Sequence, residues 1–151
     1  HGTLALLIAL DQLPRNLHRG SPRAYAGDSA ALAIALAAER EDLPAQLHPI
    51  EVPFFYLPFE HAEDLNLQRR CIAGYEREHA RSPAEYTAVF RDCLQAAHDH
   101  HLIVERFGRF PHRNAILRRA SSAAELDYLS NGGKHWHQVL PDNIRSSPDS
   151  A

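Results

Sequence analysis

The strongest constraint on the fold is a helical repeat of apolar residues that stops at Gly108. Apolar side chains recur every three or four residues along one face of this segment, which is the spacing of an α-helix. Ser82, Pro83 and Glu85 form the pattern of a capping box with proline at the first helical position, so we expect the helix to begin at Pro83. Gly108 and Pro111 prevent its continuation. The face consists of Tyr86, Phe90, Cys93, Ala97, His100, Val104 and Phe107.

The rest of the chain is also helical in its periodicity, and no segment alternates with the period of two that a half-buried strand requires. We expect helices over residues 3–13, 29–40, 59–80 and 123–129, and a short one around residues 54–56. Pro14 ends the first of these, Asp28 caps the second, and a capping box at Ser122 opens the last. The pattern predicts an all-α fold, an array of antiparallel helix pairs with about six or seven helices.

Length, charge and cysteine content limit the class of protein. The 151 residues suffice for one domain, placed at residues 1–140, and a Ser-, Pro- and Asp-rich end predicts a flexible tail over residues 141–151. A net charge of -3 gives no reason to expect nucleic acid as a partner, and no apolar run is long enough to span a membrane. Cys71 and Cys93 lack metal-site spacing and predict reduced thiols, which are typical of a cytoplasmic protein.

Residues 107–114 combine features that solvated loops and core segments rarely share. Two phenylalanines, two arginines, a histidine and an asparagine surround Gly108 and Pro111. We expect Gly108 to adopt the left-handed conformation that ends the helix, with Phe107 and Phe110 buried. Polar side chains would then line a crevice, and the asparagine would bond free groups of the next helical turn. The candidate binding residues here are Arg109, His112, Arg113 and Asn114.

A second polar group opens the helix expected over residues 59–80. Glu60, Asp64 and Gln68 are spaced i, i+4 and i+8 and would share one helical face. Acidic residues at a helix start also favour the helix dipole without any further role. The histidine beside them, His61, gains nothing from that position. We therefore take Glu60, His61, Asp64 and Gln68 as candidate binding residues.

His100 lies within an otherwise apolar helical face. Such a histidine is either a hydrogen-bonded core residue or a ligand-binding group, and the sequence leaves both interpretations open. His98 and His101 are three residues apart on a neighbouring face, a spacing that zinc can use, but no third and fourth ligand follow at a diagnostic distance. We keep His100 as a candidate binding residue and expect neither metal nor cofactor.

The first predicted helix carries an acidic residue on its apolar face. Asp11 either reaches water at the helix end or points into a polar cavity and pairs with an arginine. Beyond Pro14, the pair Arg15 and Asn16 repeats the Arg-Asn pair that follows Pro111, and each corner is either a helix cap or a clamp for carboxylates. If the two corners face each other, four arginines would surround Glu60 and Asp64. These four are Arg15, Arg23, Arg109 and Arg113.

Four motifs occur in an order that resembles one bacterial family. They are Leu10-Asp11-Gln12-Leu13-Pro14-Arg15-Asn16, Pro22-Arg23-Ala24-Tyr25-Ala26, Tyr56-Leu57-Pro58-Phe59-Glu60-His61-Ala62-Glu63-Asp64, and the segment over residues 107–114. Over about residues 4–130 the chain resembles the uncharacterised family called domain of unknown function 924. The resemblance implies an all-α fold of tetratricopeptide-like type and no assigned activity.

The chain departs from that family at several positions. Family members carry an upstream aromatic-rich segment, which has no counterpart before His1. Ala62 stands where the family tends to have Ser, and Leu13 and Tyr25 stand where it tends to have Phe. Leu102 occupies a position that is often acidic. If the upstream segment covers the site in relatives, the site here would be open or completed by another chain.

Two functions fit these patterns. The first is the binding of a small anionic metabolite, such as a carboxylate or phosphate compound, in a pocket lined by Arg, His and acidic residues. If that pocket is catalytic, His61 or His112 would act as general base, oriented by Glu60 or Asp64. The alternative is a helical protein-interaction module in which the same polar residues are buried structural struts. The nearly all-apolar helix over residues 3–10 also predicts a homodimer.

Overall fold

The computed structural model of the chain describes residues 2–134, and over that range it is all-helical, as predicted. Six α-helices and no strands occur among these residues. None of these helices combines the length and apolarity that crossing a bilayer requires. The predicted domain end at residue 140 and the tail over residues 141–151 lie outside the described part of the chain. The helices are α1 (Gly2–Leu17), α2 (Asp28–Arg40), α3 (Val52–Glu60), α4 (Leu65–Arg81), α5 (Thr87–Phe107) and α6 (Ala123–Ser130).

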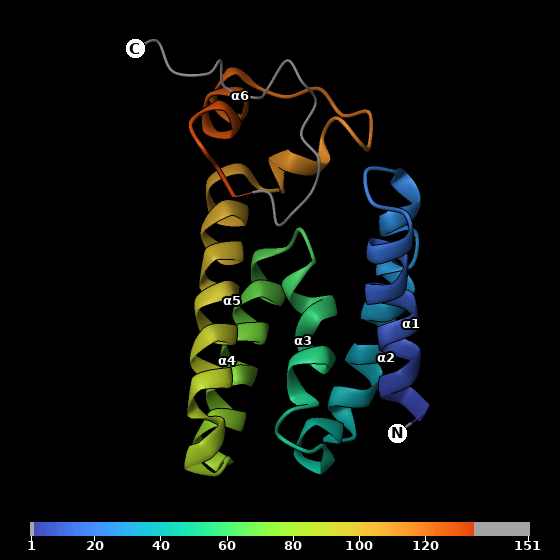
Figure 1. Cartoon of the computed structure of the whole chain (residues 1–151), viewed down its shortest axis with the longest axis vertical. Helices are drawn as coiled ribbons and strands as arrows, with labels where there is room; N and C mark the ends of the chain where they lie inside the picture. The colour runs from blue at the N-terminus through green and yellow to red at the C-terminus, as the bar shows by residue number, and fades with distance from the viewer. Residues whose placement is uncertain (1, 135–151) are drawn as a thin grey trace.

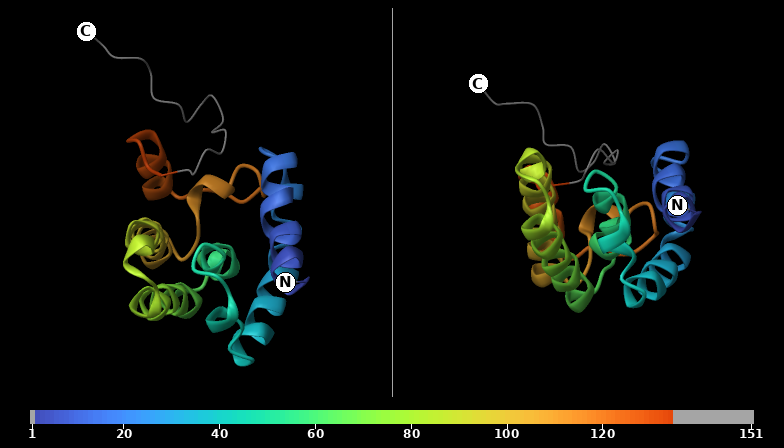
Figure 2. Two further views of the ribbon diagram at one scale, coloured as in Figure 1. Left: turned by 60° about the horizontal axis from the view of Figure 1, so that its bottom comes forward. Right: turned by 90° about the horizontal axis from the view of Figure 1, so that it is seen from below.

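The short helix α3 lies at the centre of the molecule (Figure 1). Helices α1 and α2 form an antiparallel pair on one side of it, and α4 and α5 form a second pair on the other side (Figure 2). Phe55, Tyr56 and Phe59 of α3 are fully buried between the two pairs, and their rings pack against one another. Their burial removes a large apolar area from water, which stabilises this arrangement. Helix α6 lies beyond the end of α5 and contacts the turn Pro111–Arg113.

Small residues let the helices approach one another closely. The buried face of α2 consists of Ala31, Ala35 and Ala38. Gly74 of α4 lies against the ring of Tyr56, where a β-carbon would overlap the aromatic atoms. The sequence places these small residues where the two flanking pairs meet α3, so the central helix can be enclosed on several sides.

Four predicted helix boundaries were wrong. Asp28 is the first residue of α2 and not its N-cap, which is Gly27. Helix α1 continues through Pro14 to Leu17, because a proline removes one donor but its carbonyl still accepts from the amide of His18 at 2.9 Å. Helix α5 begins at Thr87, since the Ser82 hydroxyl donates backwards to the carbonyl of Glu78 at 2.8 Å and forms no capping box. The single helix expected over residues 59–80 is two helices, α3 and α4, and Pro58 lies within α3.

The corner after α5 largely follows the prediction. Gly108 has φ 69° and ψ 0°, the left-handed conformation, and its amide bonds the carbonyl of Val104 at 2.7 Å. Phe110 is fully buried, whereas Phe107 is only half-buried and packs against Tyr128. Only the short turn Pro111–Arg113 follows, so Asn114 has no helical turn to cap. The predicted capping box at Ser122 is confirmed as the start of α6.

Candidate functional site

Between α3 and α4 the chain leaves the helical conformation over residues 61–64, and polar groups on both sides of this break lie in the interior. The carboxylate of Asp64 accepts from the amides of Asn66 at 2.8 Å and Leu67 at 3.0 Å, which makes it the N-cap of α4. The side-chain amide of buried Gln68 donates to the carbonyls of Glu60 at 2.6 Å and Ala62 at 2.8 Å. Glu60, Asp64 and Gln68 therefore share no helical face, and Asp64 is an exposed cap.

Asp11 of α1 reaches His61 across the gap between α1 and α3. Its Oδ1 lies 2.8 Å from Nδ1 of His61 and 3.0 Å from Nη1 of Arg15, and Gln12 donates to Oδ2 at 2.6 Å. Asp11 as a whole is 1% exposed. Burial raises the pKa of Asp11, but His61 and Arg15 outweigh burial and hold that pKa below its ordinary value. The residue that orients His61 is thus Asp11, in place of the predicted Glu60 or Asp64.

Glu60 and His100 lie on the other side of the His61 ring. The Oε1 atom of Glu60 is 3.3 Å from Nδ1 of His100, and the hydroxyl of Tyr75 donates to Oε2 at 3.4 Å. Burial, with a smaller contribution from the charge of Asp11, raises the pKa of Glu60 to about 8 against the opposing Tyr75 bond. The Glu60 carboxyl is therefore mostly protonated at neutral pH.

Both histidines of this cluster are neutral at physiological pH. Burial, then the nearby His61, lowers the pKa of His100 to about 3. Burial and Arg15 also lower the pKa of His61, although Asp11 opposes them. The two rings pack edge to face with centroids 6.1 Å apart. One donor atom from each of Glu60, His61 and His100 lies within 4.8 Å of the others, so the group forms a compact donor cluster.

Arg15 and Arg113 meet at a shared acid, Asp28. Arg15 makes two bonds to this carboxylate, at 2.8 and 2.9 Å, and Arg113 lies 3.7 Å from it. The guanidinium of Arg113 also donates to the carbonyl of His61 at 3.0 Å and stacks over the rings of Phe110 and Tyr25. Burial and the nearby Arg15 lower the pKa of Arg113 to about 10, so the group stays charged at neutral pH.

These residues surround a pocket of about 310 Å³, which we call the histidine pocket. Seven residues that the sequence singled out line it: Arg15, Asn16, Glu60, His61, His100, His112 and Arg113. Sequence reasoning did not assign the other four, Gln12, Arg19, Tyr25 and Leu57. Tyr25 belongs to a motif that marked the family resemblance, and that motif was the one available signal for it.

Several predicted site residues lie elsewhere. Arg23 is exposed, and Arg109 bonds Glu125 twice, at 2.7 and 2.8 Å, with a third bond to the carbonyl of Ala120. The expected ring of four arginines around Glu60 and Asp64 is therefore not formed. Asn114 is buried between the side chains of Ser121 and Arg119, where it stabilises a loop.

A structural ion pair that the sequence did not reveal joins the two polar corners. Glu63 accepts from Arg119 at 2.6 and 2.9 Å and from the backbone amide of Phe110 at 2.8 Å. Burial raises the pKa of Glu63, but these bonds outweigh it and hold that pKa below its ordinary value. The pair fixes the corner after α3 against the corner after α5, and so holds two walls of the histidine pocket in register.

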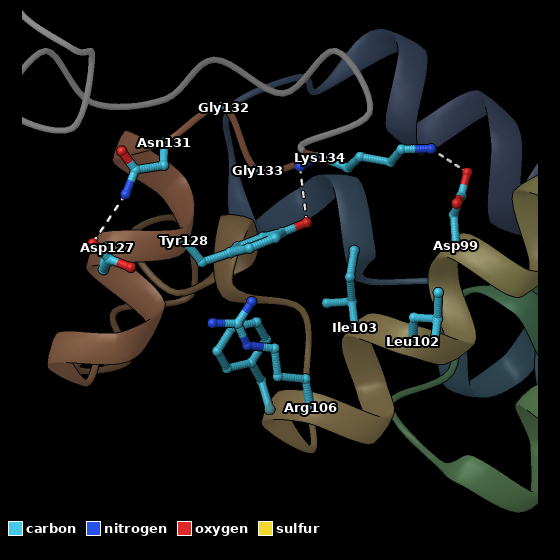
Figure 3. A pocket seen from close by; sticks show the side chains of 11 residues that line it. Asp99, Leu102, Ile103, Arg106, Asp127, Tyr128, Asn131, Gly132, Gly133 and Lys134 are labelled. Carbon is cyan, nitrogen blue, oxygen red and sulfur yellow. Dashed lines mark hydrogen bonds and ion pairs between the residues drawn. The ribbon is translucent and has the colours of Figure 1, made fainter.

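A second pocket, of about 470 Å³, lies between α5 and α6 (Figure 3). Ile103, Leu102 and the ring of Tyr128 form much of its wall. Its polar groups bond one another: Lys134 pairs with Asp99 and donates its amide to the Tyr128 hydroxyl at 2.8 Å. No histidine is among its lining residues in the described part of the chain. The histidine pocket is therefore the stronger functional candidate, although it is the smaller of the two.

The fold and the histidine pocket define a class: an all-helical protein with a buried acid–histidine–arginine site. The sequence pattern of a family described as "Bacterial protein of unknown function (DUF924)" matches residues 1–133. The chain belongs to this family, as the resemblance of its motifs predicted.

One solved structure is similar over most of the chain. It is described as the structure of a protein of unknown function, ATU0120, from Agrobacterium tumefaciens. The two sequences are 40% identical, the TM-score is 0.73, and the match covers 86% of this chain and 68% of the other. A comparison with curated proteins found no match.

Proposed function

We propose that the protein binds a small anionic molecule, a carboxylate or phosphate compound, in the histidine pocket. The observation that carries this proposal is a pair of buried donors without a partner, the hydroxyl of Tyr25 and Nε of Arg113. Both side chains line the pocket. A buried donor left unpaired costs about 1–3 kcal/mol. An anion whose oxygens accept from both groups would remove that cost, and charge-assisted bonds to arginine are the stronger kind.

The charges around the pocket also favour an anion. Arg113, Arg15 and Arg19 line it, whereas the one carboxyl group among its described lining residues, that of Glu60, is mostly protonated at neutral pH. Burial also raises the pKa of Tyr25, so its hydroxyl keeps its proton at neutral pH and can donate. The volume of the pocket suits a small metabolite rather than a polymer.

The alternative, an interaction module with buried struts, accounts for other residues. Arg109 with Glu125 and Arg119 with Glu63 are fully engaged pairs that stabilise corners. The donors of the histidine pocket are not all engaged, which favours binding. Catalysis by His61 or His112 stays a prediction. A cytoplasmic location is part of the proposal, supported by the free thiols of Cys71 and Cys93.

A thermal-shift series tests the proposal. Purified protein is melted with inorganic phosphate, glycerol phosphate, succinate or citrate. A ligand present at ten times its Kd adds about 1.4 kcal/mol of stability, which raises the Tm of a protein of this size by roughly 3–6 °C. If no anion of these classes raises the Tm, the proposal is wrong.

Matched variants locate the site. Tyr25→Phe removes one hydroxyl and Arg113→Lys removes the Nε donor while keeping a positive charge, so each should weaken binding about tenfold, the equivalent of one lost hydrogen bond. Tyr86→Phe is the control, because its hydroxyl lies 3.3 Å from His48 and outside the pocket. Arg109→Ala is a second control, since Arg109 bonds Glu125. Equal binding by all four variants would place the ligand elsewhere.

A further inference from the structure

We propose that Glu60, His61 and His100 form a site for one divalent transition-metal ion in the wall of the histidine pocket. Each residue contributes one donor atom, and these atoms lie within 4.8 Å of one another. All three residues line the same pocket. Sequence spacing singled out these three residues separately but did not group them, because Glu60 and His61 lie at the end of α3 whereas His100 lies on α5.

The hydrogen bonds of the two imidazoles fix the tautomer that a metal requires. Nδ1 of His61 faces a carboxylate oxygen of Asp11 at 2.8 Å, and Nδ1 of His100 faces the carbonyl oxygen of Ala96 at 2.8 Å. Carbonyl and carboxylate oxygens only accept, so both Nδ1 atoms carry the proton and an ion would bind at Nε2 of each ring. The Oε1 atom of Glu60 lies 3.3 Å from Nδ1 of His100, so the Glu60 side chain must turn towards Nε2 to complete the site. Metal-binding histidines are usually held by such a bond to a carboxylate or a backbone carbonyl.

The donor set indicates the class of metal. Two neutral imidazoles and the carboxylate that Glu60 becomes when the ion displaces its proton suit Zn²⁺, Co²⁺ or Fe²⁺ rather than Ca²⁺ or Mg²⁺, which prefer oxygen ligands alone. With bonds of about 2.0–2.2 Å, neighbouring ligands of a tetrahedral ion lie about 3.3 Å apart. The donor atoms lie at most 4.8 Å apart, so a bound ion requires the widest pair to close by up to about 1.5 Å through side-chain rotation.

Charges on every side of the cluster set the conditions for a bound ion. Arg15, Arg113 and the more distant Lys134 oppose a cation, whereas Asp11 and Asp28 favour it. Three protein ligands leave at least one coordination position for water or for an oxygen of a bound anion. An ion at this site would thus add a Lewis acid to the wall of a pocket that already contains arginine donors. The metal site does not depend on anion binding, because Glu60, His61 and His100 lie together in the protein itself.

Cobalt titration tests the site in the full chain. Protein stripped with a chelator and dialysed into a buffer free of carboxylates and phosphate is titrated with CoCl₂ and, separately by calorimetry, with ZnCl₂. We expect one equivalent to bind, with visible absorption bands typical of nitrogen and oxygen ligands and without the charge-transfer band of a thiolate. No uptake of either ion, or a thiolate spectrum, would overturn the proposal. Because no carboxylate or phosphate compound is present, this result is separate from the thermal-shift result.

Variants show which residues bind the ion. Glu60→Gln and His100→Gln should each weaken binding at least tenfold, and Asp11→Asn, which changes a positioning residue, should weaken it by about 10- to 100-fold. His98→Gln and His101→Gln, on the neighbouring face of α5, are the controls and should bind like the unaltered protein. Loss of binding in a control instead would refute the assignment.

A second experiment tests the metal site without any variant, in case a substitution prevents folding. Crystals of the unaltered protein soaked in ZnCl₂ should show an anomalous-scattering peak between Glu60, His61 and His100. A peak at another site, or no peak after soaking at saturating zinc, would contradict the proposal regardless of how the variants behave.

Discussion

Nδ1 of His61 lies 2.8 Å from Oδ1 of Asp11, a contact between residues 50 positions apart that joins α1 to the end of α3. Because a carboxylate can only accept, the proton lies on Nδ1 and the orientation of the ring is fixed. The same carboxylate binds Arg15, so one buried acid positions a histidine and an arginine of the histidine pocket.

Asp11→Asn should destabilise the protein by about 1–3 kcal/mol, since it removes the charge that pairs with Arg15 and places an amide donor near other donors. Urea melts of the two proteins measure this difference. Asp92→Asn is the control, because Asp92 and its partner Arg91 are both exposed and 3.6 Å apart, and the change should stay within about 0.5 kcal/mol. Equal midpoints for the Asp11 variant and the unaltered protein would show that the contact contributes nothing.

Gly108→Val should cost more than about 1 kcal/mol, because a β-branched residue is strained in the left-handed conformation. A β-carbon at this position would have nothing within 4 Å, so the cost comes from the backbone alone. Gly108→Asn serves as the comparison and should cost less, since asparagine tolerates this conformation. The urea midpoints of the two variants, compared at equal slope, measure this difference in stability. Equal midpoints for Gly108→Val and Gly108→Asn would contradict the backbone explanation.

Acid should destabilise the corner around Glu125. Hydrogen bonds from Arg109, with the amide of Ser122, lower the pKa of Glu125 to about 2 against the effect of burial. A carboxyl whose pKa is lower in the folded state stabilises the fold above its unfolded pKa, and that contribution is lost as the pH falls from about 5 towards 2.

Glu125→Gln tests this pH dependence by urea melts at a series of pH values. The variant should be less stable than the unaltered protein at pH 7, and the difference should shrink as the pH approaches 2. Glu105→Gln, on the exposed side of α5, is the control and should show no comparable trend. A difference for Glu125→Gln that is the same at both ends of the range would mean that Arg109 does not set the acid response.

We also expect a homodimer that uses an exposed face of α1. Leu6, Leu13 and Leu17 are 46%, 49% and 73% exposed, and their spacing places them on one side of the helix. Sedimentation velocity over a range of concentrations should show the dimer, and Leu13→Lys should dissociate it. Leu126→Lys, on α6, is the matched control for adding a charge at an exposed leucine. A monomer at every concentration would rule the idea out.

The sequence was informative where a few neighbouring residues decide the structure. The left-handed Gly108, the capping box at Ser122 and the burial of Phe110 all follow from local backbone chemistry and apolar spacing. One local signal, Asp64, was misinterpreted. An aspartate before an apolar repeat is a strong N-cap. Interpreted as a cap, Asp64 predicts a new helix at Leu65 and so divides the helix expected over residues 59–80.

The amino-acid sequence was enough to predict an all-α chain, its family and two polar segments, residues 60–61 and 107–114. That these segments lie close together, and which partners their side chains have, follows from the packing of the helices. Asp28 lies between Arg15 and Arg113 and pairs with both. Glu63 pairs with Arg119. Asp11, rather than Glu60 or Asp64, orients His61. Helix periodicity and caps depend on residues within about four positions of each other. Ion pairs and hydrogen bonds between helices depend instead on how the helices pack, because packing brings side chains that are distant in the sequence within about 3 Å of each other. The spacing of neighbouring residues does not predict such contacts.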